Sequence, residues 1–172
     1  MFALVIGAWL GGVVSFRTRA LGSLASRLVG AGLAGAAVAN VWIWLWVASE
    51  WHVGRAMQLE RVPGMAAAAA REYDKAYRLD PENFRAVFGV GAMAYRMGDF
   101  AKAERVLRAF QRIYPYNPPA INLLGAALMQ QGKLAEARKY FALALEVLPD
   151  FEAARQNLRQ VEMLLRLRAR PR

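Results

Sequence analysis

The chain has 172 residues, a formal net charge of +10 and a hydrophobic content of 57%. It contains no cysteine, which excludes disulfides and thiolate metal sites, and its single histidine, His52, excludes metal sites built from several histidines. The positive charge is compatible with nucleic acid, an anionic membrane surface or an acidic protein as a partner.

Charged residues are distributed unevenly, and the distribution changes near residue 50. Residues 1–49 contain three arginines and no acid, whereas residues 50–172 contain the other 20 Lys and Arg and all 13 Asp and Glu. We therefore expect two parts, an apolar one over 1–49 and a polar domain over 50–172.

The first predicted element is a helix over residues 1–16, which carry no charge. At about 1.5 Å per residue this helix is about 24 Å long, whereas the hydrocarbon core of a bilayer is roughly 30 Å thick. A secretory signal peptide would begin with basic residues, and this segment has none. We predict an uncleaved membrane helix that tilts or thins the bilayer; the alternative is a re-entrant or interfacial helix.

The second predicted element covers residues 28–48, which form 21 residues without a charge. About 20 apolar residues suffice to cross a bilayer, so this segment is predicted to be a membrane helix. Its C-terminal end carries a group of tryptophans, Trp42, Trp44, Trp46 and Trp51. Because indole rings favour the headgroup level, we interpret this group as an aromatic belt. The alternative is a patch for a partner or a pigment.

Small residues recur along both predicted membrane helices and would allow close helix packing in lipid. They are Ala3, Gly7, Gly11 and Ser15 in the first helix, and Gly32, Gly35, Ala36 and Ala39 in the second. Two interpretations remain open: the helices pack on each other as a hairpin, or one row docks another membrane protein. Asn40 does not distinguish these two interpretations, because its amide can form a hydrogen bond either to another protein or to a carbonyl within the hairpin.

The segment between the two predicted helices carries Arg17, Arg19 and Arg27 and no acid. The positive-inside rule places such a loop in the cytoplasm. We therefore predict an integral protein of the bacterial inner membrane whose polar domain lies in the periplasm.

The polar domain repeats with an offset of 34 residues. The aligned pairs include Gly91 and Gly125, Gly98 and Gly132, Ala103 and Ala137, and Pro115 and Pro149. This pattern resembles the tetratricopeptide repeat, which pairs two helices, A and B, in 34 residues. The spacing predicts repeats over 84–117 and 118–151, a degenerate repeat over 50–83 and a capping helix over 152–168.

The predicted fold is therefore all-α. An N-terminal transmembrane helical hairpin, with helices over about 1–16 and 28–48, is followed by a short helical solenoid of about two and a half repeats and the capping helix.

The resemblance also implies a binding surface, because members of this family commonly bind extended or helical peptides in the groove lined by the A helices. The positions expected to contact a partner are Arg85, Phe88, Tyr95, Arg96, Asn122, Met129 and Gln130. The alternative is a solvated groove that binds nothing. The family's clamp for a Glu-Glu-Val-Asp tail is not met, because other residue types occupy its positions, namely Phe88, Ala92, Leu123 and Gln156.

The sequence predicts neither an enzyme nor a cofactor, since no nucleophile–base pair, paired-carboxylate site or phosphate loop can be placed. His52 is expected to be a polar residue at the membrane interface. The C-terminal segment RLRARPR is either a solvated end or a contact with anionic lipid. Nucleic acid is not predicted as a partner, because no aromatic residues are interleaved with these arginines.

Together these features predict a membrane-anchored scaffold, assembly factor or accessory subunit of a bacterial inner-membrane complex. Its partners would be other proteins of the complex, bound through the membrane helices and the groove. The layout is similar to that of membrane-anchored repeat proteins that escort apocytochromes in cytochrome c maturation, and to those of polysaccharide export. The alternative is a structural subunit that braces a larger complex without binding a client peptide.

Overall fold

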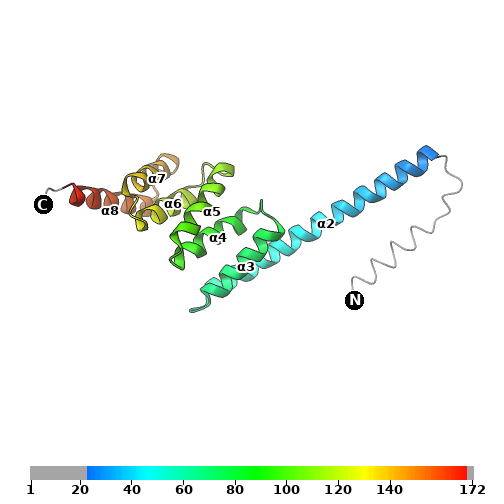
Figure 1. Cartoon of the computed structure of the whole chain (residues 1–172), viewed down its shortest axis with the longest axis horizontal. Helices are drawn as coiled ribbons and strands as arrows, with labels where there is room; N and C mark the ends of the chain where they lie inside the picture. The colour runs from blue at the N-terminus through cyan, green and yellow to red at the C-terminus, as the bar shows by residue number, and fades with distance from the viewer. Residues whose placement is uncertain (1–22, 170–172) are drawn as a thin grey trace. The chain divides into compact units, whose positions relative to one another are not determined.

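The computed structural model describes residues 23–169, with side chains described from residue 35 onward. The described elements are all α-helices (Figure 1), which confirms the predicted class. They are α2 (Ser23–Glu60), α3 (Ala66–Leu79), α4 (Phe84–Arg96), α5 (Phe100–Ile113), α6 (Pro118–Gln130), α7 (Leu134–Val147) and α8 (Glu152–Arg168). The chain divides into two compact units, Met1–Trp44 and Leu45–Arg172, and each is described by itself.

Among the residues that the structure describes, no helix is long and apolar enough to cross a membrane. The predicted helix over 1–16, with its row of small residues, lies outside the described residues. The second predicted membrane helix, over 28–48, falls within α2, where no span is found among the described residues. The membrane hairpin is therefore not shown and stays a prediction.

The described part of the first unit is the N-terminal part of α2. From residue 35 to residue 44 every side chain is exposed, although most of them are apolar. Asn40 donates from Nδ2 to the carbonyl oxygen of Ala36 at 3.1 Å, one turn earlier in the same helix. This amide is thus bonded locally, and the row around Gly35, Ala36 and Ala39 faces open space in this unit.

The second unit is a stack of helix pairs, with α4 and α5 forming one repeat and α6 and α7 the next. The turn inside each repeat holds a glycine with positive φ: Gly98 at +80° and Gly132 at +77°. The residue after each glycine donates its N–H to a carbonyl five residues back, Asp99 to Ala94 and Lys133 to Leu128. This bond closes the helix end in a Schellman-type arrangement that favours glycine.

Asparagine side chains set where the A helices begin. The side-chain oxygen of Asn83 accepts hydrogen bonds from the N–H groups of Arg85 and Ala86, and that of Asn117 accepts one from Ala120. These bonds satisfy N–H groups that have no partner inside a helix. Since Asn83 and Asn117 lie one period apart, successive A helices start at equivalent points.

Glycines inside the A helices let the B helices approach closely. A Cβ atom added to Gly125 would lie 2.7 Å from the Phe141 ring, and one added to Gly91 would lie 2.9 Å from Leu107. Phe141 and Leu107 are fully buried. Phe141 therefore packs on the glycine of its own repeat, at the crossing of α6 and α7.

A third glycine of this kind, Gly89, is not anticipated from the repeat pattern. A Cβ atom there would lie 2.4 Å from the ring of Tyr73, which comes from the B helix of the preceding repeat. Burial, together with the charge of Glu60, raises the pKa of Tyr73 to about 12. Gly89 therefore allows the first repeat to pack against the second.

A polar network joins the next two repeats. The carboxylate of Glu104 on α5 accepts hydrogen bonds from Lys133 at 2.7 Å, Gln131 at 2.9 Å and Arg108 at 3.0 Å. Arg108 also donates to Glu136 and Tyr140 on α7. The hydrogen bond from Lys133, supported by those from Gln131 and Arg108, lowers the pKa of Glu104 to about 2.

The capping helix α8 closes the stack. Ala154 and Val161 are buried against the preceding repeat, and Arg155 and Arg159 both pair with Glu152 on the outer side. One arginine of the basic C-terminal segment, Arg168, donates to the carbonyl oxygen of Gly132 at 3.2 Å. This contact ties the end of α8 back to the solenoid.

The first prediction concerns the close approach at Gly89. Gly89→Ala should lower the free energy of unfolding by about 1 to 3 kcal/mol, because the new methyl group forces Tyr73 or the backbone to shift. Gly54→Ala is the matched control in α2, since no atom lies within 4 Å of its added Cβ, and it should be neutral or stabilising by up to about 1 kcal/mol. Thermal and chemical unfolding followed by circular dichroism measure both, and equal stability of the two variants contradicts the packing argument.

The second prediction concerns Glu104. Because its pKa is lowered from 4.5 to about 2 in the folded state, its ionised form stabilises the fold above about pH 5, and this stabilisation is lost as the pH falls toward 2. Glu104→Gln should therefore cost roughly 2 to 3 kcal/mol at neutral pH. The difference in the free energy of unfolding between this variant and the wild type should shrink steadily as the pH falls from about 5 toward 2.

Glu146→Gln provides the control, since Glu146 is exposed and forms no ion pair among the described residues. It should change the free energy of unfolding little. Denaturant titrations at several pH values measure the free energy of unfolding of both variants. If the destabilisation caused by Glu104→Gln stays constant down to pH 2, the carboxylate charge is not the source of the stability.

Candidate partner-binding groove

The predicted groove residues lie on the A helices α4 and α6. On α4 the spacing from Arg85 through Phe88 to Tyr95 and Arg96 follows the helical period, so these residues share one side of the helix. Arg85, Arg96 and Gln130 are exposed, whereas the other four are half-buried: Phe88, Tyr95, Asn122 and Met129.

The half-buried aromatic residues form the floor of this surface rather than free side chains. Phe88, Tyr95 and Met129 all pack against the same buried core cluster. The ring centroid of Phe88 lies 6.0 Å from that of Phe110, and the centroid of Tyr95 lies 5.5 Å from that of Phe100. Both rings thus brace α4 against α5 and leave only part of their surface available to a partner.

The two predicted arginines are held by acids from α2. Arg85 lies 3.2 Å from Glu50, and Arg96 lies 4.0 Å from Glu60. The residue pattern does not mark Glu50 and Glu60 as groove residues, although each precedes its arginine by about one repeat period. Their charges offset those of Arg85 and Arg96, so the groove offers little uncompensated positive charge at this end.

A buried polar network fixes Glu50 in place. Asn83 donates from Nδ2 to Ser49 at 3.1 Å and to Glu50 at 2.8 Å, and the buried Ser49 hydroxyl donates to the carbonyl oxygen of Ala76. One side chain therefore caps α4 and also joins α2 to the turn between α3 and α4. Beside it lies an open cleft of about 420 Å³, lined by Trp46, Glu50, Asp80, Glu82, Asn83, Phe84 and Arg85.

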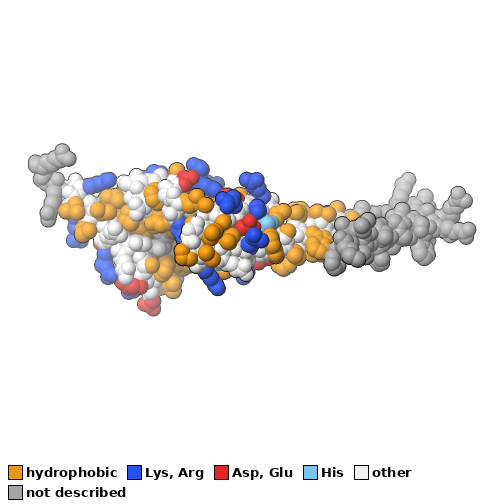
Figure 2. Space-filling model, turned by 90° about the horizontal axis from the view of Figure 1, so that it is seen from below, with side chains coloured by type: hydrophobic (Ala, Val, Ile, Leu, Met, Phe, Trp, Pro, Cys, Tyr) orange, Lys and Arg blue, Asp and Glu red, His pale blue; other side chains and the backbone are white. Residues whose placement is uncertain are grey.

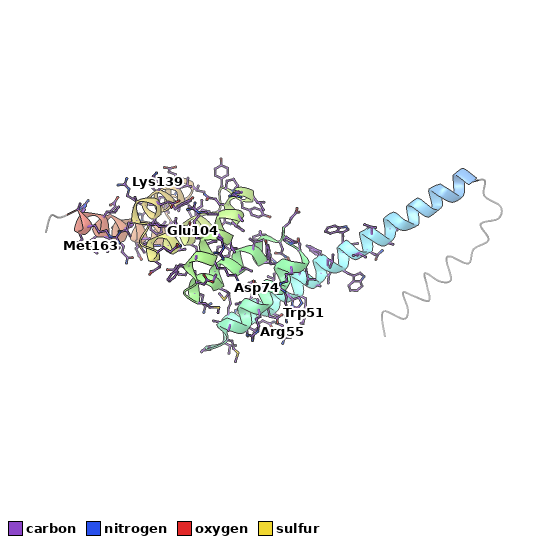
Figure 3. The ribbon with its side chains drawn as sticks, in the orientation of Figure 1. Trp51, Arg55, Asp74, Glu104, Lys139 and Met163 are labelled. Atoms are coloured by element: carbon purple, nitrogen blue, oxygen red, sulfur yellow. The ribbon has the colours of Figure 1, made fainter. Side chains whose placement is uncertain are left out.

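The groove continues onto the capping helix. Asn122 accepts a hydrogen bond from Asn157 of α8 at 2.9 Å. Met163, labelled on α8 in Figure 3, follows Met129 by one period and Tyr95 by two, and it is 56% exposed. Extending the 34-residue offset from the predicted groove residues into α8 would find Met163, the equivalent of Met129, but not Asn157, because the equivalent of Asn122 is Gln156.

The predicted interface tryptophans are solvent-exposed in the structure. Trp42 is 67% exposed, and Trp44, Trp46 and Trp51 are each 57% exposed. In α2 they are therefore outside the solenoid core.

His52 makes a contact that the sequence does not predict. It is half-buried, and its Nδ1 lies 2.6 Å from Glu72 of α3. Glu72 also accepts a hydrogen bond from Lys75 at 2.8 Å. Within the part of the chain that is described, no group of three or more His, Asp and Glu side chains is placed to hold a metal ion.

Two family models of the tetratricopeptide repeat match the chain, one over residues 94–161 and the other over residues 64–118. No curated protein matches it.

Several solved structures share its fold. The first TPR of Spaghetti (RPAP3), bound to the HSP90 peptide SRMEEVD, has a TM-score of 0.67 and 23% identity, and the match covers 70% of this chain and 94% of that one. The Yersinia enterocolitica type III secretion chaperone SycD, in complex with a peptide of the translocator YopD, has a TM-score of 0.61 and 21% identity, with coverages of 66% and 92%. MamA from Desulfovibrio magneticus RS-1 has a TM-score of 0.56 and 22% identity, with coverages of 71% and 78%.

Proposed function

The chain belongs to the tetratricopeptide repeat family, and we propose that it is a membrane-anchored scaffold that binds another protein along the A-helix groove. Repeats of this family mediate protein–protein interaction. The observation that carries the proposal is the row formed by Tyr95, Met129 and Met163, which repeats with the period of the solenoid across the A helices α4 and α6 and the capping helix α8.

The chemistry of the groove favours an apolar segment as the partner. The RPAP3 and SycD structures each contain a bound peptide, and the HSP90 peptide bound to RPAP3 is acidic. Here the clamp positions carry Phe88, Ala92, Leu123 and Gln156, and Arg85 and Arg96 are already paired with acids. An amphipathic helix or extended strand with apolar side chains toward the methionines fits this surface better than an acidic tail.

The third prediction tests the groove at exposed positions, because alanine at Phe88 or Tyr95 would also disturb the core. Gln130→Glu combined with Met163→Glu should weaken partner retention at least ten-fold, since both changes place charge in an apolar contact surface. Affinity purification from native membranes in mild detergent, followed by mass spectrometry, provides the measurement.

The matched control adds the same charge to the exposed side of helix B, with Ala101→Glu combined with Ala109→Glu on α5. It should retain the partner. If the groove variant retains the partner equally well, binding occurs elsewhere, and the chain is better described as a subunit that braces a complex without a client peptide.

The anchoring part of the proposal is supported by the surface of α2. Between residues 38 and 46 apolar side chains are exposed on every side of the helix, including Val38, Val41 and Ile43 at 57 to 59%. A helix that is apolar all round needs a non-aqueous environment, either a bilayer or a larger protein. We favour the bilayer because residues 28–48 carry no charge and because tryptophans cluster at the end of this segment.

The fourth prediction concerns the membrane and the side of the repeat domain. The chain should remain in the membrane pellet after an alkaline carbonate wash. Because Arg17, Arg19 and Arg27 favour a cytoplasmic loop, a C-terminal reporter that is active only in the periplasm should be active, and one that fluoresces only in the cytoplasm should be dark. Release by carbonate contradicts integration, and a bright cytoplasmic reporter contradicts the periplasmic placement.

Within this proposal the protein acts as an assembly factor or accessory subunit of a bacterial inner-membrane complex, without catalytic chemistry of its own. A periplasmic repeat domain is also what an escort of the cytochrome c maturation or polysaccharide export type requires. A stoichiometric complex that survives washing favours a subunit, whereas weak and substoichiometric binding favours an escort.

A further inference from the structure

The outer surface of the α2–α3 pair carries a concentration of positive charge that the groove does not use. We call Trp51, Arg55, Arg71, Lys75 and Arg78 the α2–α3 basic patch. All five side chains are exposed. Figure 2 shows several blue side chains around the pale-blue ring of the one histidine, and Figure 3 labels Trp51 and Arg55 on α2.

The pairing of His52 with Glu72 brings the two halves of the patch together. His52 belongs to α2 and Glu72 to α3, and the two side chains lie 2.6 Å apart. Trp51 and Arg55 lie within one helical turn of His52. On α3, Arg71, Lys75 and Arg78 follow one another at intervals of four and three residues, so they share one side of the helix.

The acids near the patch offset the charge of Lys75 and leave its three arginines uncompensated. The side chain of Glu72 is only 11% exposed, and its two oxygens are taken by His52 and Lys75. These two hydrogen bonds, that from Lys75 above all, lower the pKa of Glu72 and keep it ionised beneath the patch. Asp74 is paired instead with Lys102 of α5 at 3.4 Å. Arg55, Arg71 and Arg78 form no ion pair with any described residue.

Trp51 adds an amphipathic ring to this charge. The guanidinium carbon of Arg55 lies 5.4 Å from the indole centroid, within cation–π range. A half-apolar ring beside cations suits the headgroup layer of a bilayer, where indoles and basic side chains are both favoured. Trp51 also continues the tryptophan series of α2, five residues after Trp46.

We propose that the α2–α3 basic patch docks the first repeat onto the anionic phospholipid headgroups of the membrane in which α2 begins. This inference rests on the proposed membrane anchoring and adds a second contact, which would fix how the repeat domain sits on the bilayer. Charge complementarity and continuity with the tryptophans favour a lipid surface over an acidic protein.

The test uses the full chain, which contains no cysteine. Ala67→Cys introduces one exposed thiol on the same side of α3 as Arg71, and the thiol carries a fluorescent donor. The protein is reconstituted into vesicles of phosphatidylcholine, or of equal parts phosphatidylcholine and phosphatidylglycerol, with an acceptor on a small share of the headgroups. Energy transfer should be higher in the anionic vesicles and should fall at high salt.

Arg55→Gln combined with Arg71→Gln should reduce the anionic-lipid increment, with the docking equilibrium weakened roughly five-fold for each arginine. Arg105→Gln combined with Arg138→Gln is the matched control, because both residues are exposed and form no ion pair among the described residues. The control should keep the increment. An equal loss in both variants assigns the effect to total charge and overturns the proposal.

Vesicle flotation separates this proposal from the anchoring. If the protein floats with both vesicle types but energy transfer is the same with and without phosphatidylglycerol, the membrane anchoring stands and the docking is wrong. In that case, loss of a co-purifying acidic protein from the Arg55→Gln, Arg71→Gln variant would assign the patch to that protein. Flotation with anionic vesicles alone supports docking and contradicts anchoring. Flotation with neither overturns both.

Discussion

The solenoid depends on how closely helix A and helix B of each repeat approach one another. Gly125 lies directly against the ring of Phe141, and Gly91 lies against Leu107, at distances that leave no room for a methyl group. Because the large side chain fits into the space left by the glycine, each pair is held at a fixed separation and crossing. The capping asparagines, the turn glycines and the residues of the A-helix groove recur because the same helix pair is repeated with a fixed offset along the chain.

Helix α2 extends this construction into the N-terminal part of the chain. Its C-terminal part is helix A of the first repeat, and the same helix continues back without interruption to Ser23. The hydrogen bonds that join Ser49, Asn83 and Ala76 are buried, so breaking one of them would leave an unsatisfied polar group. This network therefore holds the C-terminal part of α2 in the first repeat.

The sequence identifies the all-α solenoid and its 34-residue period because they depend on residue types with a local cause. A glycine at a positive φ, such as Gly132, and a small residue at a helix crossing, such as Gly125, recur at a fixed spacing that can be recognised in the sequence. Gly89 escapes this reasoning because its partner, Tyr73, lies in another repeat, and nothing in the local sequence of α4 indicates that contact.

The candidate groove was less predictable for a related reason. The helical period is sufficient to place Arg85 and Arg96 on the same side of α4, but their pairing with Glu50 and Glu60 depends on how α2 packs against α4. The sequence predicts His52 to be a polar residue at the membrane interface, and only the pairing of α2 with α3 reveals its contact with Glu72. Long-range pairs of charges are the part of a site that composition and spacing cannot supply.

Helix α2 also separates the charges of the first repeat. At about 100° per residue, positions five apart differ by about 140° around a helix, and Arg55 lies five residues from both Glu50 and Glu60. The two acids therefore face α4, where they compensate the groove arginines, while Arg55 points to the opposite side with the α3 cations. A partner in the groove and an anionic surface on the patch would then contact different faces of one rigid helix, so each contact can form without removing the other.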